Sequence, residues 1–212
     1  MSNYLVIDLE MCRVPKGIKR QDLHLSSEII QIGAVLLDDE LKVADTFQSF
    51  VKPQQGVIDR KIQNLTGISQ KDVANAPCFE QAVNSLISWM PEDTVIVSWS
   101  DSDLFQLQKE FNAKDIDTAY FERYFESWVD CQKTFSKKMH TEKVYRLSEA
   151  LVITDIFYDE NTHNALVDAH NTADLFVKME TEDELVLSPY YSNSINCIYD
   201  SSDSLLGNYM YA

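Results

Sequence analysis

The sequence contains no long hydrophobic run and no leader-like segment at its start. No apolar stretch approaches the roughly 18 consecutive residues that a transmembrane helix requires. The chain instead enters a strand-like run at Tyr4, without a basic region followed by an apolar one. We therefore expect no membrane association and a cytoplasmic location.

Closely spaced cysteine pairs are also missing. The cysteines are widely scattered, and none belongs to a C-x-x-C pair: Cys12, Cys78, Cys131 and Cys197. This spacing argues against a structural zinc site and favours free thiols in a reducing compartment.

Basic residues are scarce relative to acidic ones. The chain carries 18 Lys and Arg against 34 Asp and Glu, which gives a net charge of −16. Non-specific nucleic-acid binders usually show the opposite balance, because phosphate neutralisation drives much of their affinity. Net charge is a sum, however, and two local basic clusters stand out, one at 13–20 and one at 133–146. Each is interpreted either as a nucleic-acid contact or as ordinary solvated surface.

Hydrophobic periodicity predicts an α/β chain. Three adjacent strands are followed by an alternation of helices and strands, and the short connections between the first three favour antiparallel pairing. We predict strands at 4–9, 28–37, 45–52, 94–99 and 127–130, and helices opening at 69–72 and near 103 and spanning 79–89, 131–138, 146–152 and 164–180. The composition then turns rich in Ser, Asn, Asp and Tyr. We divide the chain into a domain at 1–180 and an extension at 181–212 that docks partially.

Acidic residues stand at the boundaries of three of these elements. Asp8 and Glu10 end the first apolar run and, two apart in a strand, share one face. Asp103 follows the strand at 94–99, and Asp168 lies in the first turns of the last helix, five residues after His163. Carboxylates are the ligands that Mg²⁺ and Mn²⁺ prefer, and a two-ion site can cleave phosphodiesters. A histidine suits the role of general base.

Each of these residues has a simpler interpretation. Asp103 could be only a helix N-cap, a role that Asp often fills. Asp101 could be the site acid in its place, and His163 could be an ordinary surface histidine. The combination, in this order and at these boundaries, is more specific than any part of it.

The pattern resembles the DEDDh branch of the DnaQ-like (RNase T-type) 3′–5′ exonucleases. Its first motif is similar to Asp8-Leu-Glu10, its second to Trp99-Ser-Asp-Ser-Asp103, and its third to His163-x4-Asp168. The segments 28–34 and 65–68 are similar to intervening family segments, and the likeness covers residues 4–180. The sub-group it resembles contains the histone-mRNA and small-RNA trimming exonucleases and their bacterial KapD-like relatives.

The resemblance implies a ribonuclease H-like fold, with a mixed five-stranded sheet flanked by helices. It chooses Asp103 over Asp101 as the fourth acid. It implies two Mg²⁺ or Mn²⁺ ions per site, held by Asp8, Glu10, Asp103 and Asp168, with His163 as the base. The substrate it implies is a single-stranded nucleic-acid 3′ end, with RNA favoured over DNA. It leaves open a homodimer, and the extension leaves open a protein partner.

Substrate contacts are expected beside the acids. Family members often read Asp-x-Glu-Thr-Thr-Gly, and the residues after the Glu contact the terminal nucleotide. Met11 and Cys12 occupy these places here, which departs from the family pattern. We expect contacts from Met11, Cys12 and Leu65, and strand binding by Arg13 and Lys16 of the basic loop.

Two rival interpretations stay open. One is a binding or regulatory module, catalytically weak, that is recruited through its acidic surface or tyrosine-rich tail. The other is a short-oligonucleotide scavenger or DNA-trimming enzyme, because high negative charge disfavours long polymers.

Overall fold

A computed structural model describes residues 3–15, 25–119, 121–158 and 163–191. Its centre is a sheet in the order β3-β2-β1-β4-β5. The strands are β1 Asn3–Arg13, β2 Ser27–Leu37, β3 Val43–Phe50, β4 Thr94–Ser98 and β5 Val129–Asp130. β2 is antiparallel to both neighbours, whereas β1, β4 and β5 run parallel. The predicted mixed five-stranded sheet is confirmed.

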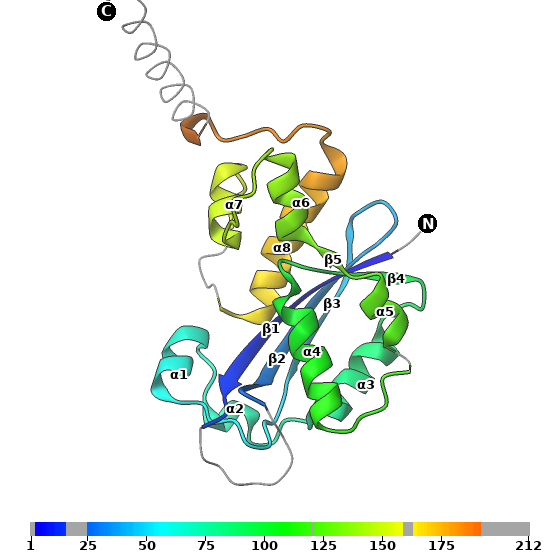
Figure 1. Ribbon diagram of the computed structural model, residues 1–212, viewed down its shortest axis with the longest axis vertical. Coiled ribbons are helices and arrows are strands. Elements are labelled where there is room, and N and C mark those ends of the chain that lie inside the picture. Colours follow the sequence, from blue (N-terminus) through cyan, green and yellow to red (C-terminus); the bar gives the residue numbers. More distant parts are fainter. Residues whose placement is uncertain (1–2, 16–24, 120, 159–162, 192–212) are drawn as a thin grey trace, which may run out of the picture.

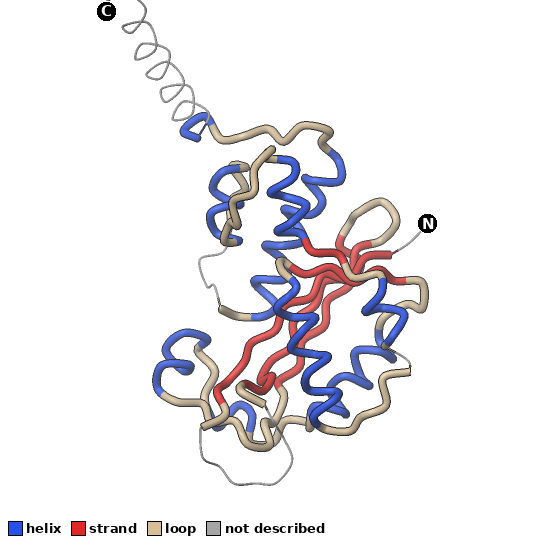
Figure 2. Tube along the Cα trace, in the orientation of Figure 1, coloured by secondary structure: helices blue, strands red, loops and turns tan. Residues whose placement is uncertain are grey.

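Helices cover both faces of this sheet (Figures 1 and 2). Side chains alternate along β1, so Leu5, Ile7 and Leu9 join one apolar cluster and Val6 joins the other. The first cluster includes α3 Phe79–Trp89, α4 Asp101–Ala113 and α5 Glu122–Glu126. The second includes α6 Cys131–Lys138, α7 Leu147–Ile153 and α8 Ala165–Thr181. The sheet therefore has two separate cores, and β1 and β2 contribute to both.

Two short helices were not among the sequence predictions. α1 spans Arg60–Thr66, and its ends carry recognisable signals: Asp59 caps the Ile62 amide, and Gly67 closes the helix at a φ of 72°. A left-handed residue at this place favours glycine. α5 has no side-chain cap. The opening predicted at 69–72 corresponds to the single turn α2, Gln70–Val73, with the expected Ser69–Asp72 capping box. Within the described ranges, no helix is long and apolar enough to cross a membrane.

A buried charge network joins the start of β2 to α4. The Lys114 ammonium lies between two fully buried carboxylates, 3.1 Å from Glu28 Oε1 and in contact with Glu110. Glu28 also accepts hydrogen bonds from the backbone amides of residues 54–56. Glu110 accepts one from the Ile29 amide at 2.5 Å. These bonds fix the loop before α1 against β2 and α4.

The predicted extension begins where α8 ends. Its described part packs on the second core through Leu185, Leu187 and Tyr191. The Ser188 amide donates to the Ile153 carbonyl at 2.7 Å. This agrees with partial docking, but residues 192–212 lie outside the described part, so the two-part division stays a prediction.

Candidate active site

The strand β1 directs two carboxylates toward α8. Asp8 and Glu10 follow Val6 in the alternation and therefore project from the face that α8 covers, while Leu9 is buried in the other core. A register shift between β1 and β2 directly follows Glu10. Bulges of this kind often lie beside active sites, where they redirect a strand.

The start of α8 packs directly against the backbone of β2. A Cβ on Gly33 would lie 2.2 Å from the Ala165 carbonyl carbon, so only glycine allows this approach. The buried Gln31 accepts a hydrogen bond from the Ala165 amide at 3.0 Å. Asn164 caps the helix by accepting from the Leu166 and Val167 amides. These contacts set the position of Asp168 in the first turn of α8.

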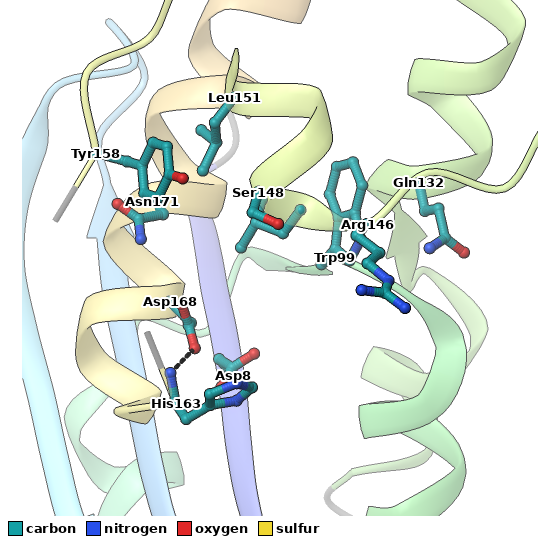
Figure 3. A pocket seen from close by; sticks show the side chains of 11 residues that line it. Asp8, Trp99, Gln132, Arg146, Ser148, Leu151, Tyr158, His163, Asp168 and Asn171 are labelled. Atoms are coloured by element: carbon teal, nitrogen blue, oxygen red, sulfur yellow. Dashed lines mark hydrogen bonds between the residues drawn. The ribbon is translucent and has the colours of Figure 1, made fainter. Parts of the chain in front are cut away.

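His163 lies just before this helix in an unusual backbone conformation. Its φ is 69°, in the left-handed region that non-glycine residues seldom adopt. Its amide donates to Asp168 Oδ2 at 2.8 Å (Figure 3). Possible ligand atoms of Glu10, His163 and Asp168 all lie within 4.8 Å of one another. Strain at such a residue is tolerated when its surroundings fix it, and it often marks a functional position.

The structure places Asp103, and not Asp101, against the acids of β1. Asp103 is 5% exposed, and its charge raises the pKa of both Asp8 and Glu10. Asp101 instead contacts Lys133 of α6. The N-cap of α4 is Ser100, whose hydroxyl accepts from the Ser102 amide, so Asp103 is not a helix cap.

The four carboxylates are electrostatically unfavourable together. Burial, together with the charges of Asp168 and Asp103, raises the pKa of Glu10 to about 7. Burial also raises the pKa of Asp103 to about 7. The pKa of Asp8 is raised well above its ordinary value by burial and then by the other three acids. Burial raises the pKa of Asp168 too, against the hydrogen bond from His163.

This donor set fits hard divalent cations. Within the described ranges, no Lys or Arg forms an ion pair with any of the four carboxylates. Oxygen ligands suit Mg²⁺ and Mn²⁺, and a bound cation would remove the repulsion that raises these pKa values. Asp8, Glu10, Asp103 and Asp168 are therefore the residues that could hold metal ions.

A cavity of about 700 Å³ opens beside these acids. Asp8, His163 and Asp168 line one end, and residues of α6, α7 and α8 line the other (Figure 3). Several lining residues were not singled out from the sequence: Gln132, Ser148, Tyr158 and Asn171. Two others were, because Trp99 belongs to the second motif and Arg146 to the basic cluster at 133–146. Asn171 had a signal, because it lies one helical turn after Asp168 and shares its face.

The predicted substrate contacts fall in different surroundings. The Cys12 side chain is 1% exposed and packs in a third apolar cluster with Ile30 and Ile62, which does not fit a side-chain contact with substrate. Met11 is partly buried against the first core. Arg13 is exposed at the end of β1, and Leu65 is 45% exposed on α1. Lys16 and most of the basic loop lie outside the described residues.

Comparison with known proteins agrees with this geometry. The family model RNase_T, described as "Exonuclease", matches residues 5–176. The match runs from the start of β1 into α8 and so contains all five site residues.

Relatives and solved structures carry related names. The chain is 27% identical over 190 residues to "3'-5' exoribonuclease 1" of Rattus norvegicus, covering 82% of this chain and 52% of that protein. It is 29% identical over 181 residues to "ERI1 exoribonuclease 2" of Homo sapiens, covering 74% of this chain and 26% of that protein. The chain thus spans about half or less of these relatives. The nuclease domain of 3'hExo, a DEDDh family member bound to rAMP, superposes on this chain with a TM-score of 0.74 at 24% identity. The superposition covers 88% of this chain and 96% of that structure's chain.

Proposed function

The chain belongs to the RNase_T exonuclease family, and from this we propose that it is a metal-dependent 3′–5′ exonuclease that releases nucleoside monophosphates from single-stranded ends. The observation that supports this most is the convergence of four carboxylates, each with a raised pKa, and one histidine at the edge of a cavity.

We assign each residue a role. Asp8, Glu10, Asp103 and Asp168 would hold two divalent cations, and Asp8 is the acid whose pKa is raised by burial and by all three of the others. When bound, two such ions activate water and stabilise the attacking and leaving oxygens of a phosphodiester. His163 accepts the proton of the attacking water at its imidazole, since it is exposed and lies within reach of Glu10 and Asp168.

RNA is the favoured substrate, with Mg²⁺ or Mn²⁺ as the cation. The support for RNA is the likeness to relatives named exoribonucleases, of which this chain covers only part. The support for these two cations is the all-oxygen carboxylate set.

The test uses matched single-stranded RNA and DNA oligonucleotides labelled at the 5′ end, incubated with Mg²⁺ or Mn²⁺. Wild type should shorten the RNA one nucleotide at a time from its 3′ end, and chelation or Asp8→Ala should abolish this. An inactive wild type would favour the binding-module interpretation. Equal activity in Asp8→Ala would exclude the proposed site. Faster shortening of DNA, or of dinucleotides only, would instead favour the trimming or scavenging alternative.

A further inference from the structure

The cavity continues beyond the catalytic acids and changes character along its length. At one end lie the carboxylates of Asp8 and Asp168 with His163. At the other, Arg146 projects from the start of α7 beside Trp99 and Gln132 (Figure 3). Its volume of about 700 Å³ is far larger than one phosphate group and lies within the range of small-molecule sites. The carboxylates at the first end suit cations. The Arg146 end must therefore bind another part of the ligand, one that carries negative charge.

Arg146 is the one Lys or Arg among the described residues that line this cavity. No described carboxylate pairs with its guanidinium within 4.0 Å, so its charge is available to a ligand. Its backbone, by contrast, is firmly held. The Arg146 amide donates to Glu149 Oε2 at 2.9 Å, and the Gln132 side chain donates to the preceding carbonyl of Tyr145 at 2.7 Å. The buried Tyr145 ring packs edge-on against Phe135, with centroids 5.1 Å apart.

A buried donor at this end of the cavity has no hydrogen-bond partner. It is the indole N–H of Trp99, a residue that is 9% exposed. The Asn171 side chain lies on the acid side instead (Figure 3), where it hydrogen-bonds to Asp168. Unpaired buried donors are rare and costly, and a ligand with an acceptor oxygen would satisfy the Trp99 indole. Trp99 and Arg146 together give this end of the cavity a donor and a positive charge. That chemistry recognises a phosphodiester.

We propose that this end of the cavity binds the nucleotide on the 5′ side of the scissile phosphate, with Arg146 contacting the next phosphate of the strand. In this proposal the terminal nucleotide lies toward α1 and the rest of the strand leaves toward α7. These two helices lie on opposite sides of the α8 start (Figure 1). The Arg146 guanidinium then attracts the strand locally, although the net charge of −16 repels it overall. The inference rests on the proposed function for its substrate class.

The test measures binding, so that it does not depend on turnover. Two trinucleotides are compared in Ca²⁺: one with native linkages, and one whose linkage nearer the 5′ end is a neutral methylphosphonate. Dissociation constants come from competition against a fluorescent oligonucleotide. Wild type should bind the native trinucleotide about tenfold more tightly, as expected for a charge-assisted hydrogen bond to phosphate. In Arg146→Met this preference should fall to nearly one.

Lys137→Met is the matched control, because Lys137 carries the same charge on the neighbouring helix α6 and does not line the cavity. It should keep the wild-type preference. A purely structural role for Arg146 would weaken both trinucleotides equally and leave the preference intact, which would overturn the proposal. So would a wild type that binds both equally. A wild type that shows the preference but cleaves no strand would support this subsite while refuting the proposed catalytic function.

Discussion

Neutralising Glu10 should stabilise the metal-free protein, although it should destroy its activity. Glu10 is 8% exposed, and the pKa of its carboxyl is raised from 4.5 to about 7, first by burial and then by Asp168 and Asp103. A carboxyl with a raised pKa binds its proton more tightly in the folded chain. Its contribution to stability is therefore complete below its ordinary pKa of 4.5 and is lost as pH rises through about 7.

The magnitude follows from the size of this rise. Each tenfold change in proton affinity is worth about 1.4 kcal/mol. The rise from 4.5 to about 7 therefore costs the ionised, metal-free protein on the order of 3 kcal/mol. Because Glu10→Gln has no charge to bury, it should be more stable than wild type at pH 8 by up to this amount. For a chain of this size, the melting temperature should rise by about 6 to 12 °C.

Thermal unfolding followed by circular dichroism measures this difference. With a chelator, Glu10→Gln should melt above wild type at pH 8, and the gap should close toward pH 5, where wild-type Glu10 is protonated. With saturating Mg²⁺ the gap should shrink or reverse, because bound cations stabilise only the ionised site. The matched control is Glu126→Gln, the same change at an exposed position of α5, which should shift neither curve. A Glu10→Gln protein that melts at or below wild type at pH 8 would refute this electrostatic reasoning.

Three other outcomes are expected. Asp103→Asn should lower kcat at least a hundredfold. Asp101→Asn removes only a surface contact with α6, so its kcat should stay within a few-fold of the wild-type value. Equal losses of kcat in a steady-state assay would contradict the assignment of Asp103. Gly33→Ala should force the start of α8 off β2, because the new Cβ has no space, and circular dichroism should show a lower melting temperature alongside reduced activity; wild-type values for both would contradict the close contact. Lys114→Met should lower the free energy of unfolding in urea by about 3–5 kcal/mol, since it leaves two buried carboxylates unpaired. A decrease below about 1 kcal/mol, the size of a minor effect, would show that the network is dispensable.

Much of the fold was predictable because local patterns and tertiary contacts agree. The helix predicted at 79–89 matches α3, and the alternation of Asp8, Leu9 and Glu10 correctly placed Leu9 in a core. The short helix α1 escaped prediction, since its length gives too few turns to show a periodicity, although Asp59 and Gly67 marked its ends.

The cavity beside the acids could not be predicted for a different reason. Its lining comes from single residues on separate elements, such as Trp99 after β4, Arg146 before α7 and Asn171 within α8. Trp99 belongs to the second motif and Asn171 lies one turn after Asp168, but neither position in sequence indicates Arg146 as a neighbour. Only the packing of α7 over α8 brings the three together. Cys12 shows the converse: adjacency to Glu10 in sequence suggested a substrate contact, but the packing of the third cluster buries its side chain.

We propose that the acids from β1, α4 and α8 form one two-cation site beside His163. A crystal soaked in Mn²⁺ and a nucleoside 5′-monophosphate tests this directly, because anomalous scattering locates the ions. We predict two Mn²⁺ ions about 4 Å apart, held by Asp8, Glu10, Asp103 and Asp168, with the His163 imidazole directed toward the phosphate between them. A single ion, or ions bound elsewhere while these four carboxylates stay free, would contradict this two-cation site.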